Sequence, residues 1–131
     1  MATQVTQILN MLDEDLYRLG NATSPKLSNV RPGDVSIYVR NGIAMVRANG
    51  FGISLITEER LNKQRPGSYG WKLPANFRIP HGLGLNPDNR FVKQGQKPDH
   101  YFLCPVSDMT LGEYTALLYK LAPILERVRK L

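Results

Sequence analysis

The dipeptide Asn41-Gly42 is the feature that most restricts how this chain can fold. It separates two runs, residues 35–40 and 43–47, that are rich in β-branched residues or alternate in polarity. Asn and Gly readily supply the two positive φ angles that a type I′ turn requires. The pattern therefore predicts a two-residue β-hairpin, and with it an antiparallel sheet in at least part of the fold.

Shorter apolar runs predict further strands on both sides of this hairpin. Several of them lie between prolines, which are tolerated at the ends of short strands and at sheet edges. The segment 58–97 is otherwise rich in loop-forming residues. The additional expected strands are residues 16–18, 53–57, 71–73, 77–79, 83–85 and 100–104.

Helices are expected near both ends of the chain. Apolar residues at positions 5, 8, 9 and 12 follow the i, i+3, i+4, i+7 spacing, which predicts a short amphipathic helix over residues 3–13. Thr110 and Glu113 form a capping-box pattern at the start of a second helix. Its apolar face continues through Leu125 and Val128, and Pro123 should kink this helix or end it early.

These elements predict an α+β fold. The expected architecture is a twisted, mostly antiparallel sheet with a short N-terminal helix and a longer C-terminal helix. A chain of 131 residues fits one domain, residues 1–131, and can bury a core without metals or disulfides. The single cysteine, Cys104, excludes an intramolecular disulfide and favours a reducing compartment. We expect no signal peptide and no membrane insertion, since neither a secretory leader nor an apolar run of 18 residues is present.

The chain is basic, with a formal net charge of +6. The basic residues do not form one block, but the segment from Arg60 to Lys97 carries eight of them and a single acidic residue, Asp88. Such a segment is expected to attract phosphates or an acidic protein, although it could equally be a solvated surface.

No standard catalytic motif occurs in the sequence: there is no P-loop, GxGxxG, HExxH or GxSxG pattern. We expect no metal site, because His81 and His100 are far apart in sequence and neither has a second soft ligand at metal-binding spacing. Cys104 lies in an apolar run, where a thiol is usually an inert small hydrophobic residue.

Three short segments remain as candidate functional residues. Tyr17-Arg18 places an aromatic ring next to a guanidinium, and a guanidinium is suited to bind phosphate. The alternative is that Arg18 forms a structural salt bridge with one of the acidic residues at 13–15. Gly50 to Ser54 brings a hydroxyl next to glycines that permit close approach of a ligand. His100, between Asp99 and Tyr101, is either structural or an acid–base group.

The order of these segments resembles that in type VI secretion effector toxins whose fold looks like a mono-ADP-ribosyltransferase. The resemblance covers the chain from about residue 14 to its end, and it includes a C-terminal helix with a basic end. The matching segments are Leu16-Tyr17-Arg18, Gly52-Ile53-Ser54-Leu55-Ile56, Trp71-Lys72-Leu73-Pro74, Ile79-Pro80-His81-Gly82-Leu83, and His100-Tyr101 with Cys104-Pro105.

The resemblance implies a site that binds NAD as a substrate. Arg18 matches the arginine that holds NAD, and Ser54 matches a serine that shapes the nicotinamide pocket. His100 and Tyr101 match a pair implicated in toxicity. The resemblance thus implies Ser54 and His100 as catalytic residues, and Tyr17, Arg18, Tyr101 and Trp71 as NAD-binding residues, with the aromatic rings available for stacking.

The chain departs from most ADP-ribosyltransferases in one respect. They carry a glutamate that stabilises the oxocarbenium-like ribose, whereas His100 occupies the start of the matching strand, and Glu58 and Glu59 are candidates only by elimination. Related RNA 2′-phosphotransferases carry out NAD chemistry with arginine and histidine, so the absence is compatible with catalysis.

The resulting hypothesis is a toxin that acts in the cytoplasm on an unknown target and is neutralised by a cognate immunity or antitoxin protein. The alternative is a basic, non-enzymatic domain that binds nucleic acid or protein, since basic residues alternate with Trp71, Phe77 and Phe91. A third hypothesis keeps the fold but assigns it an RNA-processing reaction that uses NAD.

Overall fold

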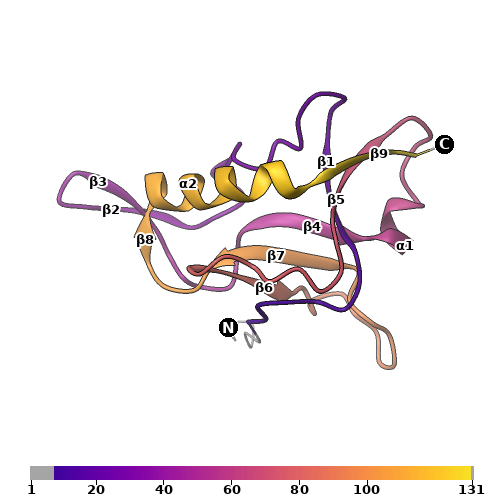
Figure 1. The fold of residues 1–131 in the computed structure, drawn as a ribbon. Coiled ribbons are helices and arrows are strands. Elements are labelled where there is room, and N and C mark those ends of the chain that lie inside the picture. The colour runs from indigo at the N-terminus through magenta and orange to yellow at the C-terminus, as the bar shows by residue number, and fades with distance from the viewer. Residues whose placement is uncertain (1–7, 131) are drawn as a thin grey trace.

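The computed structural model describes residues 8–130, and its strands form two antiparallel sheets (Figure 1). The larger sheet has six strands in the order β6-β7-β4-β1-β5-β9, and the smaller has three in the order β2-β3-β8. The strands of the larger sheet are β1 (Leu16–Gly20), β4 (Ile53–Thr57), β5 (Tyr69–Leu73), β6 (Leu83–Pro87), β7 (His100–Pro105) and β9 (Glu126–Arg129). Those of the smaller sheet are β2 (Ile37–Arg40), β3 (Ile43–Val46) and β8 (Met109–Thr110). The helices are α1 (Glu58–Leu61), α2 (Leu111–Leu121) and a short 3₁₀ helix, Ala122–Ile124.

The predicted hairpin is confirmed as β2 and β3. Arg40 pairs with Ile43 across a two-residue loop, and both loop residues have positive φ, 52° at Asn41 and 75° at Gly42. In Figure 1 this hairpin extends away from the larger sheet. The α+β fold with mostly antiparallel strands is therefore confirmed at the level of class and strand pairing.

Helix α2 begins at the predicted capping box and covers one face of the larger sheet (Figure 1). The Thr110 hydroxyl accepts a hydrogen bond from the Glu113 amide, and the Glu113 carboxylate accepts one from the Thr110 amide, each at 3.0 Å. Three residues at helical spacing point into the core, which they form together with the inward residues of the sheet: Tyr114, Leu118 and Leu121.

The prediction that the same helical face continues to Val128 is wrong. Pro123 lies in the 3₁₀ turn, and Leu125 adopts an extended backbone with ψ of 139°. Because proline has no N–H to donate, the helical ladder cannot pass through it. The basic residues that were expected to lie at a helix C-terminus are therefore in strand β9, where Arg127 and Arg129 flank the Tyr69 ring.

The predicted N-terminal helix is wrong over residues 8–13, and residues 3–7 of that prediction lie outside the described residues. The backbone there is irregular, and at a single bridge Leu9 exchanges two hydrogen bonds with Leu85 on β6, at 2.8 and 2.7 Å. Leu9 and Leu12 pack against the core from this irregular segment. The apolar spacing thus reflects burial at a sheet edge, and a partner strand satisfies the backbone in place of a helix.

The predicted strands at 71–73 and 83–85 are confirmed and are longer than expected, as β5 and β6. The one at 77–79 is wrong: Ile79 is buried, but its amide donates to the Asn10 carbonyl in an irregular segment. Helix α1 was not predicted, and it is capped by the Thr57 hydroxyl.

Across the residues that the structure describes, no helix has both the length and the apolar character that crossing a membrane requires.

Candidate functional site

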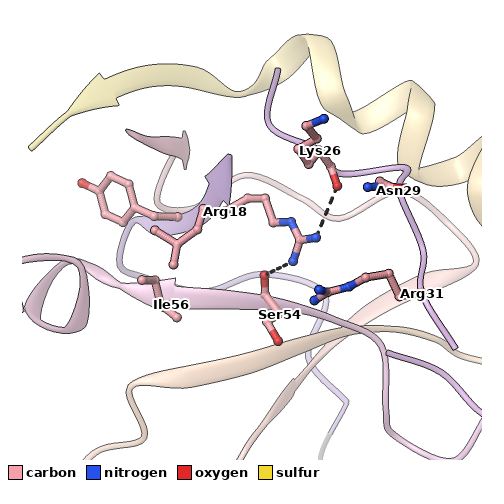
Figure 2. Close-up of a pocket in the computed structure, with 8 residues that line it drawn as sticks. Arg18, Lys26, Asn29, Arg31, Ser54 and Ile56 are labelled. Carbon is pink, nitrogen blue, oxygen red and sulfur yellow. Dashed lines mark hydrogen bonds between the residues drawn. The ribbon is translucent and has the colours of Figure 1, made fainter. Parts of the chain in front are cut away.

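A pocket opens where strands β1 and β4 separate. The two strands pair at Leu16–Thr57 and Tyr17–Ile56, whereas β1 stays paired with β5 as far as Gly20. The gap is about 410 Å³ in volume, and the segment after β1 contributes to its wall. Figure 2 shows this pocket, whose lining residues are Tyr17, Arg18, Leu19, Lys26, Asn29, Arg31, Ser54 and Ile56.

Arg18 is the buried cation of this pocket, with 9% of its surface exposed. Its Nη1 donates to the Ser54 carbonyl at 3.2 Å and its Nη2 to the Lys26 carbonyl at 3.3 Å, as Figure 2 shows. Its Nε is buried and has no hydrogen-bond partner among the described residues. Burial lowers the pKa of the guanidinium, because the charged form loses its hydration.

The alternative role for Arg18, a salt bridge with an acidic residue at 13–15, has no support among residues 8–130, where no ion pair involves this side chain. Asp15 instead lies 3.9 Å from the Lys72 ammonium and accepts a hydrogen bond from the Ala75 amide. Asp34 acts on Arg18 at longer range while it accepts from the Arg31 amide. A buried guanidinium with a spare donor and no carboxylate next to it is suited to bind an anionic group of a ligand.

The segment between β1 and β2 supplies three pocket residues that the sequence did not identify: Lys26, Asn29 and Arg31. Arg31 adds positive charge near Arg18, and Lys26 contributes the main-chain carbonyl that accepts from it. Leu27 anchors the segment, since its side chain is 2% exposed and belongs to the main core. An isolated leucine inside a polar, loop-forming stretch is the sequence signal that could have indicated a segment folded back onto the sheet.

Tyr17 also lines the pocket, and its ring belongs to a small second core with Ile56 and Leu61. Its hydroxyl donates to a carboxylate oxygen of Glu58 at 3.1 Å. Burial, together with this hydrogen bond, raises the pKa of Tyr17 to about 12. The structure thus brings Tyr17, Arg18 and Ser54 to one pocket.

Ser54 contributes to the pocket in two ways. Its carbonyl orients Arg18, and in Figure 2 its hydroxyl points away from Arg18, toward the opposite side of β4. The preceding glycines were interpreted as space for a ligand, and this interpretation is wrong for Gly52. A Cβ at that position would lie 2.1 Å from the Leu103 carbonyl oxygen, so Gly52 permits close packing of β4 against β7.

His100 begins β7, on the side of β4 away from β1. It lies directly opposite Ile56, which lines the pocket, while Phe102 lies opposite Ser54. Directly opposed residues on antiparallel strands have Cβ atoms about 5 Å apart, and diagonal ones about 7 Å. His100 is therefore a close neighbour of the pocket on the sheet face that carries Ile56 and Ser54, although it does not line it.

Two predicted NAD-binding residues lie elsewhere. Tyr101 is buried in the main core, where burial raises its pKa to about 12. Trp71 packs against the same core, and its ring N–H donates to the Asn21 carbonyl at 2.9 Å. Neither residue lines the pocket at Arg18, so their roles in NAD binding stay predictions.

The remaining reactive side chains give no sign of a second chemistry. Burial raises the pKa of the Cys104 thiol to about 11, so this side chain remains a neutral thiol at physiological pH. Within the described part of the chain, no three His, Cys, Asp or Glu side chains gather in a way that could hold a metal ion.

Comparison with known proteins gives one finding. A family model described as Tse2 ADP-ribosyltransferase toxin matches residues 12–129, and so includes every residue of the pocket. Neither the curated proteins nor the solved structures contain a match to this chain.

Proposed function

The chain belongs to the Tse2 ADP-ribosyltransferase toxin family, and from this premise we propose that it is a toxin that uses NAD as the donor of ADP-ribose. The reaction breaks the bond between nicotinamide and ribose and joins the ribose carbon to an acceptor on a target molecule. The target is unidentified. The pocket between β1 and β4 is the proposed NAD site.

The observation that carries this proposal is the burial of the Arg18 guanidinium without a neighbouring carboxylate. Its guanidinium is buried, binds two carbonyl oxygens, and keeps Nε without a partner among residues 8–130. Burying a cation in this way costs free energy unless a counter-charge is supplied. The pyrophosphate of NAD would supply that charge, and Lys26 and Arg31 in the pocket wall would add to the attraction.

The other residues then have distinct roles in the proposal. Ser54 fixes the direction of the Arg18 guanidinium through its carbonyl. Its hydroxyl points away from Arg18, so it would meet the nicotinamide ribose where NAD passes through the gap between β1 and β4. Tyr17 supports the pocket wall, since its buried ring packs with Ile56 and Leu61. His100 is the proposed acid–base group, one strand away from Ser54.

The family suggests where the protein acts and how it is controlled. We propose that the protein acts in the cytoplasm of a target cell, that a type VI secretion system delivers it, and that a cognate immunity protein neutralises it. A toxin that uses NAD must be restrained inside the cell that makes it, and a protein that covers the pocket would achieve this.

The basic segment between Arg60 and Lys97 is less available to an acidic partner than its sequence suggests. Arg60 and Lys72 lie within 4.0 Å of carboxylates outside the segment, and Lys63 lies next to Glu59. Arg90 binds Asp88 within the segment. The alternative of a basic binding module rests on the net charge of +6 and on basic residues interleaved with Trp71, Phe77 and Phe91, and it stays a hypothesis.

The test measures nicotinamide release from NAD by the purified full chain, together with growth of a bacterial host during induced cytosolic expression. The variant is Arg18→Met, and the matched control is Arg65→Met, which removes an exposed cation from a turn. We expect the wild type and the control to release nicotinamide and arrest growth, and Arg18→Met to do neither. Equal activity of Arg18→Met and wild type, or an inactive and harmless wild type, contradicts the proposal.

A further inference from the structure

Asp88, Arg90 and His100 form a hydrogen-bonded cluster outside the pocket at Arg18. One carboxylate oxygen of Asp88, Oδ2, lies 2.8 Å from Nδ1 of His100 and accepts from Nη2 of Arg90 at 2.9 Å. The other oxygen, Oδ1, accepts from Nε of Arg90 at 2.8 Å and from the Arg90 amide at 3.2 Å. The backbone joins the same two segments, since the Asp88 amide donates to the His100 carbonyl at 2.9 Å.

The Asp88 carboxylate is itself buried, with 5% of its side chain exposed, and it is ionised. The Arg90 hydrogen bonds hold the pKa of Asp88 well below its usual value, and the bond to His100 lowers it further. An ionised carboxylate can only accept hydrogen bonds. Nδ1 of His100 must therefore carry a proton, and in the neutral ring the lone pair lies on Nε2.

Nε2 of His100 is free for chemistry. Within residues 8–130 this atom forms no hydrogen bond to another protein group, whereas the ring itself is held by Asp88 and by edge-to-face contact with Phe102. His100 also lines a cavity of about 110 Å³. The charged groups that surround it there are Arg60, Asp88, Lys97 and Asp99.

The position of His100 connects this cluster with the proposed NAD site. His100 is directly opposite Ile56 and diagonal to Ser54, and both of those residues line the pocket. The cluster is thus one strand away from the pocket, on the sheet face that carries Tyr17, Ile56 and Ser54. Arg18 points to the other face, so NAD held there would reach the His100 side through the gap between β1 and β4.

We propose that Asp88, held by Arg90, is a positioning residue that fixes His100 with its proton on Nδ1, so that Nε2 accepts a proton from the acceptor group during ADP-ribose transfer. This inference rests on the proposed function. As the ribose–nicotinamide bond breaks, the nicotinamide nitrogen keeps the electron pair, and the oxygen of an acceptor O–H group bonds to the ribose carbon. The acceptor proton passes to Nε2, and the Asp88 carboxylate stabilises the imidazolium that forms.

The geometry predicts what an amide in place of Asp88 would do. The oxygen of Asp88→Asn is expected at the Oδ1 position, because two N–H donors of Arg90 meet there. Its NH₂ group then occupies the Oδ2 position, where the bond from Nη2 of Arg90 is lost, and donates to Nδ1 of His100. His100 is forced into the tautomer with its proton on Nε2, which removes the lone pair of that atom.

The first experiment reads the tautomer directly. The full chain is made by cell-free synthesis with ¹⁵N-labelled histidine, and His81→Gln assigns the two histidines in ¹H–¹⁵N spectra. We expect the shifts of His100 at neutral pH to report a protonated Nδ1 in the wild type and a protonated Nε2 in Asp88→Asn. Glu126→Gln, the same chemical change on the exposed strand β9, should leave the spectrum of His100 unchanged. An unprotonated Nδ1 in the wild type, or an unaltered tautomer in Asp88→Asn, overturns the inference.

The second experiment measures NAD hydrolysis, in which water is the acceptor, for wild type, Asp88→Asn, His100→Ala and the double variant. We expect Asp88→Asn to lower kcat about 100-fold with little change in KM, and the double variant to lose no more than His100→Ala. Wild-type kcat in a folded Asp88→Asn variant would overturn the positioning role while leaving the proposed function intact. An inactive wild type would contradict the proposed function and its catalytic step, and the tautomer experiment would still decide whether Asp88 fixes the ring.

Discussion

Nη1 of Arg18 donates a hydrogen bond to the main-chain carbonyl of Ser54, 3.2 Å away, at the place where β1 and β4 separate (Figure 2). A main-chain acceptor on one strand therefore sets the direction of the cation on the next. The guanidinium is oriented without a carboxylate next to it, and its charge remains available to a ligand. The predictions below test this site and the packing that supports it.

Arg18→Met should separate stability from ligand binding. The substitution removes a buried charge that no ion pair offsets in the described chain, so we expect the free energy of unfolding to fall by no more than about 1 kcal/mol. Binding of NAD should be lost, because the pyrophosphate no longer meets the buried cation. Urea denaturation and isothermal titration with NAD measure the two quantities. Unfolding of the variant in buffer would show that Arg18 is a structural residue.

Acid should destabilise the protein through Asp88. Its folded-state pKa is depressed below the usual 3.8, so its contribution is complete above about pH 4 and is lost as the pH falls below that value. We expect this carboxylate to account for about 2 kcal/mol of the loss, because its hydrogen bonds are charge-assisted. Urea denaturation at several pH values measures the effect, and Asp88→Asn should show a flatter dependence below pH 4. If the free energy of unfolding falls with pH in parallel for wild type and Asp88→Asn, the loss does not come from Asp88.

Gly52→Ala should prevent stable folding. The new Cβ would lie 2.1 Å from the Leu103 carbonyl oxygen, so β4 and β7 would have to separate, at a cost of more than about 3 kcal/mol. Gly33→Ala is the matched control, because a Cβ at that position meets no atom within 4 Å. Thermal unfolding followed by circular dichroism compares the two variants. Similar melting temperatures would show that the sheet can adjust at Gly52.

Tyr114→Phe should weaken the packing of α2 on the sheet. The Tyr114 hydroxyl donates to the Leu103 carbonyl at 2.5 Å and accepts from the Ile53 amide at 3.2 Å, all within the core. Removing it should lower the free energy of unfolding by about 1–3 kcal/mol. Tyr119→Phe, on the exposed side of the same helix, should change it by less than about 0.5 kcal/mol. Chemical denaturation measures both, and equal effects would argue against a structural role for the buried hydroxyl.

Interactions between residues close in sequence were predicted well. The Asn41-Gly42 turn and the Thr110–Glu113 capping box are each complete within four residues, so their chemistry can be read directly from the chain. The N-terminal helix was predicted wrongly, because periodic apolar residues mark burial without specifying the backbone. The bridge between Leu9 and Leu85, which ties this segment to β6, joins positions far apart in sequence.

The candidate site was predicted only in part, because its residues also come from positions far apart in sequence. Arg18 and Ser54 were identified as residues, and the structure brings them together. Lys26 and Arg31 were missed, because their place in the pocket depends on Leu27 being buried in a core that other elements form. Asp88 was counted as one acidic residue in a basic segment, and only the pairing of β6 with β7 places it against His100.

The sequence by itself determined the turn, the capping box, most of the strands and the order of the chemical groups, because these depend on local backbone preferences and on apolar patterning. Tertiary structure decided which groups meet. It separated β1 from β4, left Arg18 buried without a carboxylate beside it, and oriented His100 through Asp88. These contacts depend on strand order and register, because strand pairing brings together residues that are far apart in sequence.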